Sequence, residues 1–232
     1  VYEVLHKIFY VKENKNLDFE ILRYDDGSAA KAKIRALLML FNIYRHEQNN
    51  TRLSFKQYDA VDWDIEHIHA RNSQELATAD AHQVWLEEQN LIIKSLTGTH
   101  QVELQQKLNE YLSADTAQKS TYRDAYEKLL NDIVGDASEG IHTLDNLCLL
   151  PEEVNRSIGN DLFFIKRQDI RNREKKWEEQ RKEQRLQGKV KQVNFIPLAS
   201  QQVFSKYFSV DVTQMLAWQA SDRNAYKNAL IE

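Results

Sequence analysis

Hydrophobic residues recur at helical spacing along most of the chain. Between Ala29 and His46, apolar side chains three and four positions apart predict an amphipathic helix, preceded by a turn at 25–28. The same spacing predicts helices over Gln83–Leu96, Val102–Leu112 and Tyr122–Val134. In the tail, helices are expected over 201–208 and 212–220, with Ser221-Asp222 capping a last helix. The pattern therefore predicts a mainly α protein.

Two short stretches break the helical pattern and predict strands. The segment Val-Asp-Trp-Asp-Ile-Glu-His-Ile-His at 61–69 alternates apolar and acidic residues, which is typical of a half-buried strand. Leu147–Leu150 is a continuous apolar run, which favours a buried strand. Pro151 then suits the first position of a helix, with two glutamates in its first turn. We expect a small α+β core, in the order strand, strand, helix.

Candidate chemistry gathers around these strands. Glu66 and His67 stand where the first strand ends, Asn146 directly precedes the second, and Asn155 lies on the helix that follows. A carboxylate is a hard oxygen ligand suited to Mg²⁺, and a neutral imidazole is a general base near pH 7. Together they could hydrolyse a phosphodiester. Taken alone, a Glu-His pair is more often a solvated strand end.

These four positions resemble the motif of HNH, or His-Me finger, nucleases, including the nine-residue step from Asn146 to Asn155. The chain is similar above all to the HNH domain at the C-terminus of GmrSD-type restriction and phage-defence proteins. The resemblance runs from about Tyr58 to Ile231 around a variable insert. It rests on these segments: Glu-His-Ile at 66–68, Leu-x-Asn-Leu-x-Leu-Leu at 144–150, Asn-Arg-Ser-Ile-Gly-Asn at 155–160, Phe-x-x-Lys-Arg at 163–167, Ile196-Pro197, Phe204 to Tyr207, Trp218, and Asp222 to Tyr226.

Two positions depart from the family pattern: Ala70 stands where proline is usual, and Asp145 where glycine is usual. Neither change removes a functional group. Both concern the geometry of a loop.

The resemblance implies a ββα-metal core and a role for each motif residue. His67 would take a proton from water, Asn146 would hold the loop and the histidine, and Glu66 and Asn155 would bind one Mg²⁺ or Mn²⁺ ion. Consecutive residues of a flat strand point to opposite faces, so we expect the chain to bend at Glu66-His67. DNA contacts are expected from Arg156, Lys166, Arg167 and Arg171, and supporting contacts around the site from His69, His142 and Asn160.

Charge and composition narrow the class of protein. The 232 residues carry a net charge of −4, yet segment 166–191 holds 11 basic and 5 acidic residues. That asymmetry suits phosphate contacts on one face, although a solvated helix would show it too. One cysteine, Cys148, excludes a disulfide framework and a cysteine-rich zinc site. No apolar run approaches a membrane span and no signal peptide is seen, so we expect a cytoplasmic protein.

The domain prediction has three parts. Residues 1–57 form a helical lead-in, expected to join a missing N-terminal domain that the resemblance implies to be a nucleotide-dependent recognition module. Residues 58–170 form the nuclease core with a helical insert at 71–140, and residues 171–232 form a basic helix and a helical tail. The expected partner is modified or foreign DNA. A homodimer would explain cleavage of both strands.

Three alternatives stay open at this point. The finger could be a non-catalytic, DNA-binding or regulatory scaffold. It could be an HNH nuclease that acts on RNA. The histidines His67, His69 and His142 could instead bind zinc for hydrolysis.

Overall fold

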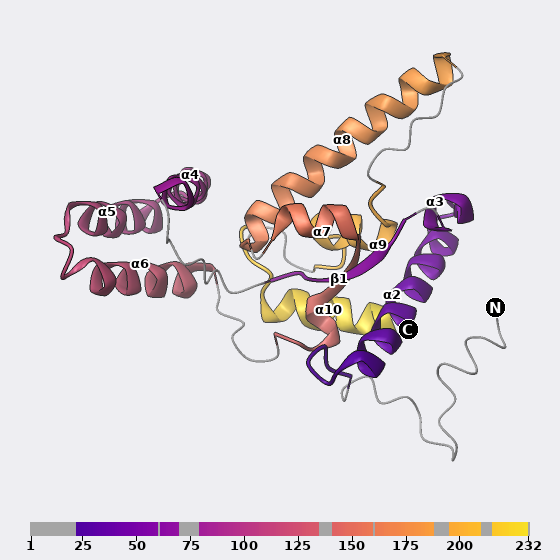
Figure 1. The fold of residues 1–232 in the computed structure, drawn as a ribbon, viewed down its shortest axis with the longest axis horizontal. Helices are drawn as coiled ribbons and strands as arrows, with labels where there is room; N and C mark the ends of the chain where they lie inside the picture. The colour runs from indigo at the N-terminus through magenta and orange to yellow at the C-terminus, as the bar shows by residue number, and fades with distance from the viewer. Residues whose placement is uncertain are drawn as a thin grey trace.

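The computed structural model describes residues 22–59, 61–69, 79–134, 141–159, 161–187, 195–209 and 215–231. Over these residues the chain is mainly helical, with one small antiparallel sheet of two strands. Figure 1 shows the sheet at the centre, with α7 and α8 above β1 and α2 and α10 below it in this view. The predicted class, mainly α with a small α+β core, agrees with this architecture.

The sheet is formed by two segments about eighty positions apart in the sequence. Strand β1 (Trp63–His67) pairs antiparallel with β2 (Leu147–Pro151), so that Glu66 lies opposite Cys148 and His67 opposite Leu147. Every residue of β2 is buried, as its apolar run predicted. Helix α7 (Glu152–Ile158) follows at once. Pro151 is the last residue of the strand and the N-cap of α7. The helix therefore begins at Glu152, one residue later than we expected.

Helices from both ends of the chain cover this sheet. They are α2 (Ser28–Gln48), the short α3 (Phe55–Asp59), α8 (Phe163–Gln187), α9 (Leu198–Phe204) and α10 (Ala220–Ile231); a 3-10 turn, η2 (Leu144–Asn146), precedes β2. The predicted helix at 29–46 is confirmed. It begins after Gly27, whose φ of 92° lies in the left-handed region that glycine adopts at little cost. The helix expected near the start of the lead-in (residues 1–57) lies outside the described residues.

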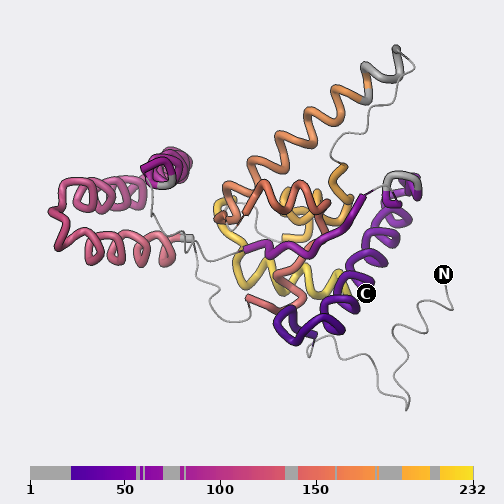
Figure 2. Tube along the Cα trace, viewed as in Figure 1, coloured from indigo at the N-terminus to yellow at the C-terminus, as the bar shows by residue number. Residues whose placement is uncertain are grey.

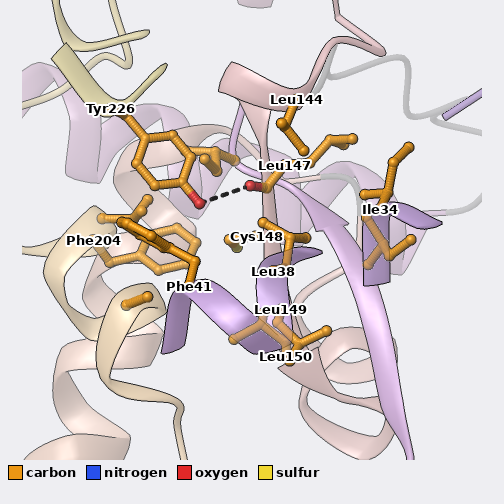
Figure 3. Close-up of a cluster of buried hydrophobic side chains, with 14 of the residues drawn as sticks. Ile34, Leu38, Phe41, Leu144, Leu147, Cys148, Leu149, Leu150, Phe204 and Tyr226 are labelled. Carbon is orange, nitrogen blue, oxygen red and sulfur yellow. Dashed lines mark hydrogen bonds between the residues drawn. The ribbon is translucent and has the colours of Figure 1, made fainter. Parts of the chain in front are cut away.

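The main core is built between α2, β2 and the C-terminal helices. Figure 3 shows Leu38 and Phe41 of α2, the leucines of β2, and Phe204 and Tyr226 packed together. The hydroxyl of Tyr226 donates a hydrogen bond to the carbonyl oxygen of Leu147 at 3.1 Å. Burial of each such side chain contributes roughly 1.5–3 kcal/mol, so the tail stabilises the strand that carries the motif.

The tail differs from the prediction in detail. Residues 215–219, expected to be helical, form no regular element, because Trp218 inserts into the main core and donates its indole N–H to the carbonyl oxygen of Asp145 at 3.1 Å. Helix α10 begins at Ala220, before the predicted cap. Asp222 lies in its first turn and accepts the N–H of Gln219 at 2.8 Å, which is half of a capping box.

The insert between the motif halves is a separate group of three helices, set to one side of the sheet in Figures 1 and 2. These are α4 (Ala79–Ser95), α5 (Thr99–Ser113) and α6 (Lys119–Val134). Trp85 and Tyr111 are buried in a second cluster, as predicted for core anchors. Leu162, just before α8, and Phe164, in its first turn, belong to the same cluster and join the insert to the part of the chain around the sheet.

This junction contains a buried glutamate whose ionised form is unfavourable. Glu88 of α4 is 8% exposed, and its Oε2 has no hydrogen-bond partner within the described part of the chain. Burial and the nearby carboxylate of Asp161 raise the pKa of Glu88 to about 7. The folded protein therefore holds a proton that the unfolded chain, with a carboxyl pKa of about 4.3, has released. Stability should fall as the pH rises from about 4.5 to 7 and then level off.

Glu88→Gln should remove this loss of stability at high pH, because glutamine carries no charge. We expect the free energy of unfolding in urea to rise by about 1–3 kcal/mol at about pH 8 and to change little at about pH 4.5. Glu103→Gln on the exposed face of α5 is the matched control and should have no effect at either pH. An equal gain for Glu88→Gln at both pH values would show that its charge is not the cause.

Candidate functional site

One face of β1 is acidic. Asp64 and Glu66 are two positions apart and so share a face of the strand. Asn155 of α7 donates its amide Nδ2–H to Asp64 Oδ2 at 2.7 Å, while its buried Oδ1 has no hydrogen-bond partner among the described residues. Buried acceptors without partners are uncommon, so this oxygen is a candidate cation ligand. Sequence reasoning missed Asp64, although its spacing from Glu66 could have revealed it.

The carboxylate of Glu66 is held by a lysine. Lys166 of α8 donates hydrogen bonds from Nζ to Glu66 Oε1 and, at 2.8 Å, to the carbonyl oxygen of His67. Lys166 is 0% exposed and Glu66 is 7% exposed. Burial raises the pKa of Glu66, and the ammonium of Lys166 opposes that rise. The prediction that Lys166 contacts DNA is wrong for this structure, because the side chain has no surface from which to reach a phosphate.

The opposite side of β1 carries the histidine. His67 Nε2 lies 3.0 Å from Nδ1 of His142, and the ring of Tyr24 meets the His67 ring edge-on at a centroid distance of 4.7 Å. Burial, followed by the nearby charges of His142 and Lys166, lowers the pKa of His67 to about 4. The imidazole is therefore neutral at pH 7. If Nε2–H donates to His142, Nδ1 is the nitrogen that can accept a proton.

The expected bend at Glu66-His67 is not found there. Both residues lie within β1 and in register with β2, and the chain turns only at Ile68 and His69. The continuous pairing with β2 keeps the strand extended, so the Glu66 and His67 side chains leave it on opposite faces. Lys166 connects the Glu66 carboxylate to the backbone carbonyl oxygen of His67, and not to its imidazole.

Asn146 fastens the turn that follows β1. Its Oδ1 accepts the N–H of His69 at 2.9 Å, and its Nδ2 donates to the carbonyl oxygens of His69 and Ile141, both at 2.9 Å. The backbone N–H of Ile68 donates to the Asn146 carbonyl oxygen at 2.8 Å. Asn146 is almost fully buried, so these bonds fix the end of the strand that carries His67. Its role in catalysis stays a prediction.

Asp145, the residue before Asn146, has partners of its own. Arg223 of α10 donates to both of its carboxylate oxygens at 3.0 Å and to the hydroxyl of Thr143 at 2.8 Å. A bidentate arginine–carboxylate pair holds both groups in one geometry. Asp145 thus ties the loop before β2 to α10.

The remaining predicted DNA contacts differ in exposure. The Arg156 side chain is 73% exposed and the Arg171 side chain 45% exposed, each in a surface ion pair with a glutamate of its own helix. Arg167 is partly buried, and burial lowers its pKa. Arg173 connects α8 to α7 through the hydroxyl of Ser157 at 2.9 Å. Arg156 and Arg171 are therefore the best placed for a phosphate.

The other predicted site residues are not all brought together. His142 contacts His67, the side chain of His69 is buried, and Asn160 lies outside the described residues. Across the described ranges, no three histidine, cysteine, aspartate or glutamate side chains are placed to hold one metal ion. In the alternative zinc set, His67 and His142 are in contact, but the three histidines do not form such a group.

Within the same residues, no helix combines the length and the apolar character that a membrane span requires. Comparisons of the chain with models of protein families, with curated proteins and with solved structures find no match.

Proposed function

We propose that this chain is a metal-dependent endonuclease of the HNH type, which hydrolyses phosphodiester bonds in DNA. The observation that carries the proposal is the buried, unpartnered Oδ1 of Asn155 on the helix that follows two antiparallel strands, beside the acidic face of the first. The order strand, strand, helix, with the motif residues at its junctions, supports the assignment to a ββα-metal finger.

The residues present suit a divalent cation such as Mg²⁺ or Mn²⁺. Glu66 and Asn155 would hold the ion through a carboxylate and an amide oxygen, which are the donors that such hard cations prefer. Asp64 orients the Asn155 amide by accepting its N–H. When bound, the ion would stabilise negative charge on the phosphate and on the departing sugar oxygen.

His67 supplies the base in this proposal. Its neutral ring, held through Nε2 by His142, accepts a proton from the attacking water at Nδ1. A phosphate lying across the end of β1 would meet both faces of the strand, and so both the metal ligands and the histidine. Asn146 keeps that strand end in place through the His69 backbone.

The substrate side of the proposal rests on charge and on the motif resemblance. Arg156 and Arg171 are exposed near α7, where guanidinium groups can pair with phosphates. By resemblance, the chain is the nuclease part of a restriction or phage-defence protein that acts on modified or foreign DNA, together with a nucleotide-dependent domain. Cleavage of both strands would require a homodimer or two successive nicks.

A plasmid assay tests the function. The full chain with Mn²⁺ should nick supercoiled DNA, and EDTA or Asn155→Ala should abolish the reaction, because each removes the bound ion. Asn90→Ala, an exposed amide on α4, is the matched control and should leave nicking unchanged. Nicking that persists in EDTA would contradict the proposal.

One observation favours a second candidate, a non-catalytic DNA-binding module on the same scaffold. The carboxylate proposed for the metal already has a cation partner, Lys166. Such a module would shift DNA in a gel equally well with and without Mn²⁺, and would leave it intact. Dependence of DNA cleavage on Glu66 separates the two candidates.

A further inference from the structure

Lys166 is a fully buried cation on an otherwise apolar face of α8. It lies on one helical face with Phe163, three positions before it, and Ile170, four positions after it, and both are buried in the main core. Lysine is seldom buried without a partner, because loss of hydration opposes the charge. Here the partners are the Glu66 carboxylate and the His67 carbonyl oxygen.

A second buried lysine in the chain has a different surrounding. Lys206 is 1% exposed and pairs with Asp222 at 2.9 Å, in the tail. Asp222 is held by the hydroxyl of Ser209 and the N–H of Gln219 as well, so that pair is part of the α10 start. The Lys166 pair instead joins α8 to the two adjacent motif residues of β1.

We propose that Lys166 is an internal counter-ion of Glu66 that competes with the metal ion for its carboxylate and thereby sets the metal affinity of the site. This inference rests on the proposed function, because it takes Glu66 as a metal ligand. Lys166 is a positioning residue in this view. It keeps the buried carboxylate satisfied until a divalent cation replaces it.

The geometry supports a replaceable partner. Two cations bound to one carboxylate repel each other strongly at low effective dielectric, so the ammonium must withdraw when the ion binds. Lys166 can do so without losing every acceptor, because its bond to the His67 carbonyl oxygen is separate from its bond to Glu66. The Glu66 carboxylate can therefore have either of two partners, the Lys166 ammonium or the metal ion.

Calorimetric titration of the full chain with Mn²⁺ tests the competition without any measurement of cleavage. Lys166→Met should lower the Mn²⁺ dissociation constant by about tenfold or more, because it removes the competing charge. Lys166→Gln, which is neutral but still donates a hydrogen bond, should also lower the Mn²⁺ dissociation constant. It serves as a second variant in case Lys166→Met does not fold. Lys206→Met, the matched buried-lysine control, should leave the constant unchanged.

The outcomes separate this inference from the proposed function. Equal Mn²⁺ affinity in the wild type and both Lys166 variants, abolished by Glu66→Gln, would overturn the competition and leave the metal site standing. Weaker binding in both Lys166 variants would also overturn it, since the lysine would then assist the ion. No Mn²⁺ binding in any variant, or binding that survives Glu66→Gln, would overturn both proposals.

Discussion

His67→Ala should lower the rate of plasmid nicking by about 10²- to 10⁴-fold, the range that a general base contributes. The ring is neutral at pH 7, and its Nε2 is held by His142, which presents Nδ1 for a proton. Alanine keeps the strand backbone, including the carbonyl oxygen that accepts the N–H of Lys166. The measurement is the initial rate with saturating Mn²⁺, together with the Mn²⁺ affinity, which should change little.

The matched control for this prediction is His100→Ala, which removes an exposed histidine at the start of α5. It should nick at the wild-type rate. Full activity in His67→Ala would remove the base from the proposal and point to another proton acceptor. A loss of activity accompanied by loss of Mn²⁺ binding would assign His67 to the metal site instead.

Local patterns predicted the elements where burial follows one simple period. The run Leu147–Leu150 indicated a buried strand because both of its faces are covered. The apolar spacing at 29–46 indicated α2 because one face of that helix packs on the sheet. The helix predicted over 212–220 is wrong for 215–219 because Trp218 is held by a distant carbonyl oxygen, that of Asp145, and a local pattern cannot reveal such a contact.

The sequence predicted which residues belong to the candidate site better than it predicted the contacts that they make. The bend that we expected to bring Glu66 and His67 to one side is absent, because pairing with β2 continues through His67 and keeps the two side chains on opposite faces. The position of Lys166 in a basic segment, directly after the motif helix, indicated a DNA contact. Its place between Phe163 and Ile170 on the buried face of α8 was the signal that composition hid.

The sequence could not predict the side-chain pairs that join distant segments. Asp145 with Arg223, and Asn155 with Asp64, depend on how the tail and α7 pack around the sheet. Each polar group alone fits a surface role equally well. Only packing, which removes water from these groups, makes their partners necessary.

Asn146→Ala should reduce both stability and activity. The change removes three side-chain hydrogen bonds and leaves the backbone N–H and carbonyl oxygen of His69 without the partners that Asn146 supplies. We expect the free energy of unfolding to fall by about 2–4 kcal/mol, because buried groups without partners are costly. The loosened strand end should also misplace His67, so the nicking rate per folded molecule should fall by about tenfold or more, as expected of a mispositioned catalytic group.

Asn42→Ala separates positioning from stability. Asn42 of α2 is as deeply buried as Asn146, donates to the carbonyl oxygen of Leu38 and accepts the N–H of Ala199, both at 2.8 Å, and does not contact the motif residues. Its loss should also destabilise the protein in urea, while the rate per folded molecule stays at the wild-type value. If the two variants lose activity equally at matched stability, Asn146 serves the fold alone. A selective loss in Asn146→Ala would show that the turn after β1 must be held for His67 to act.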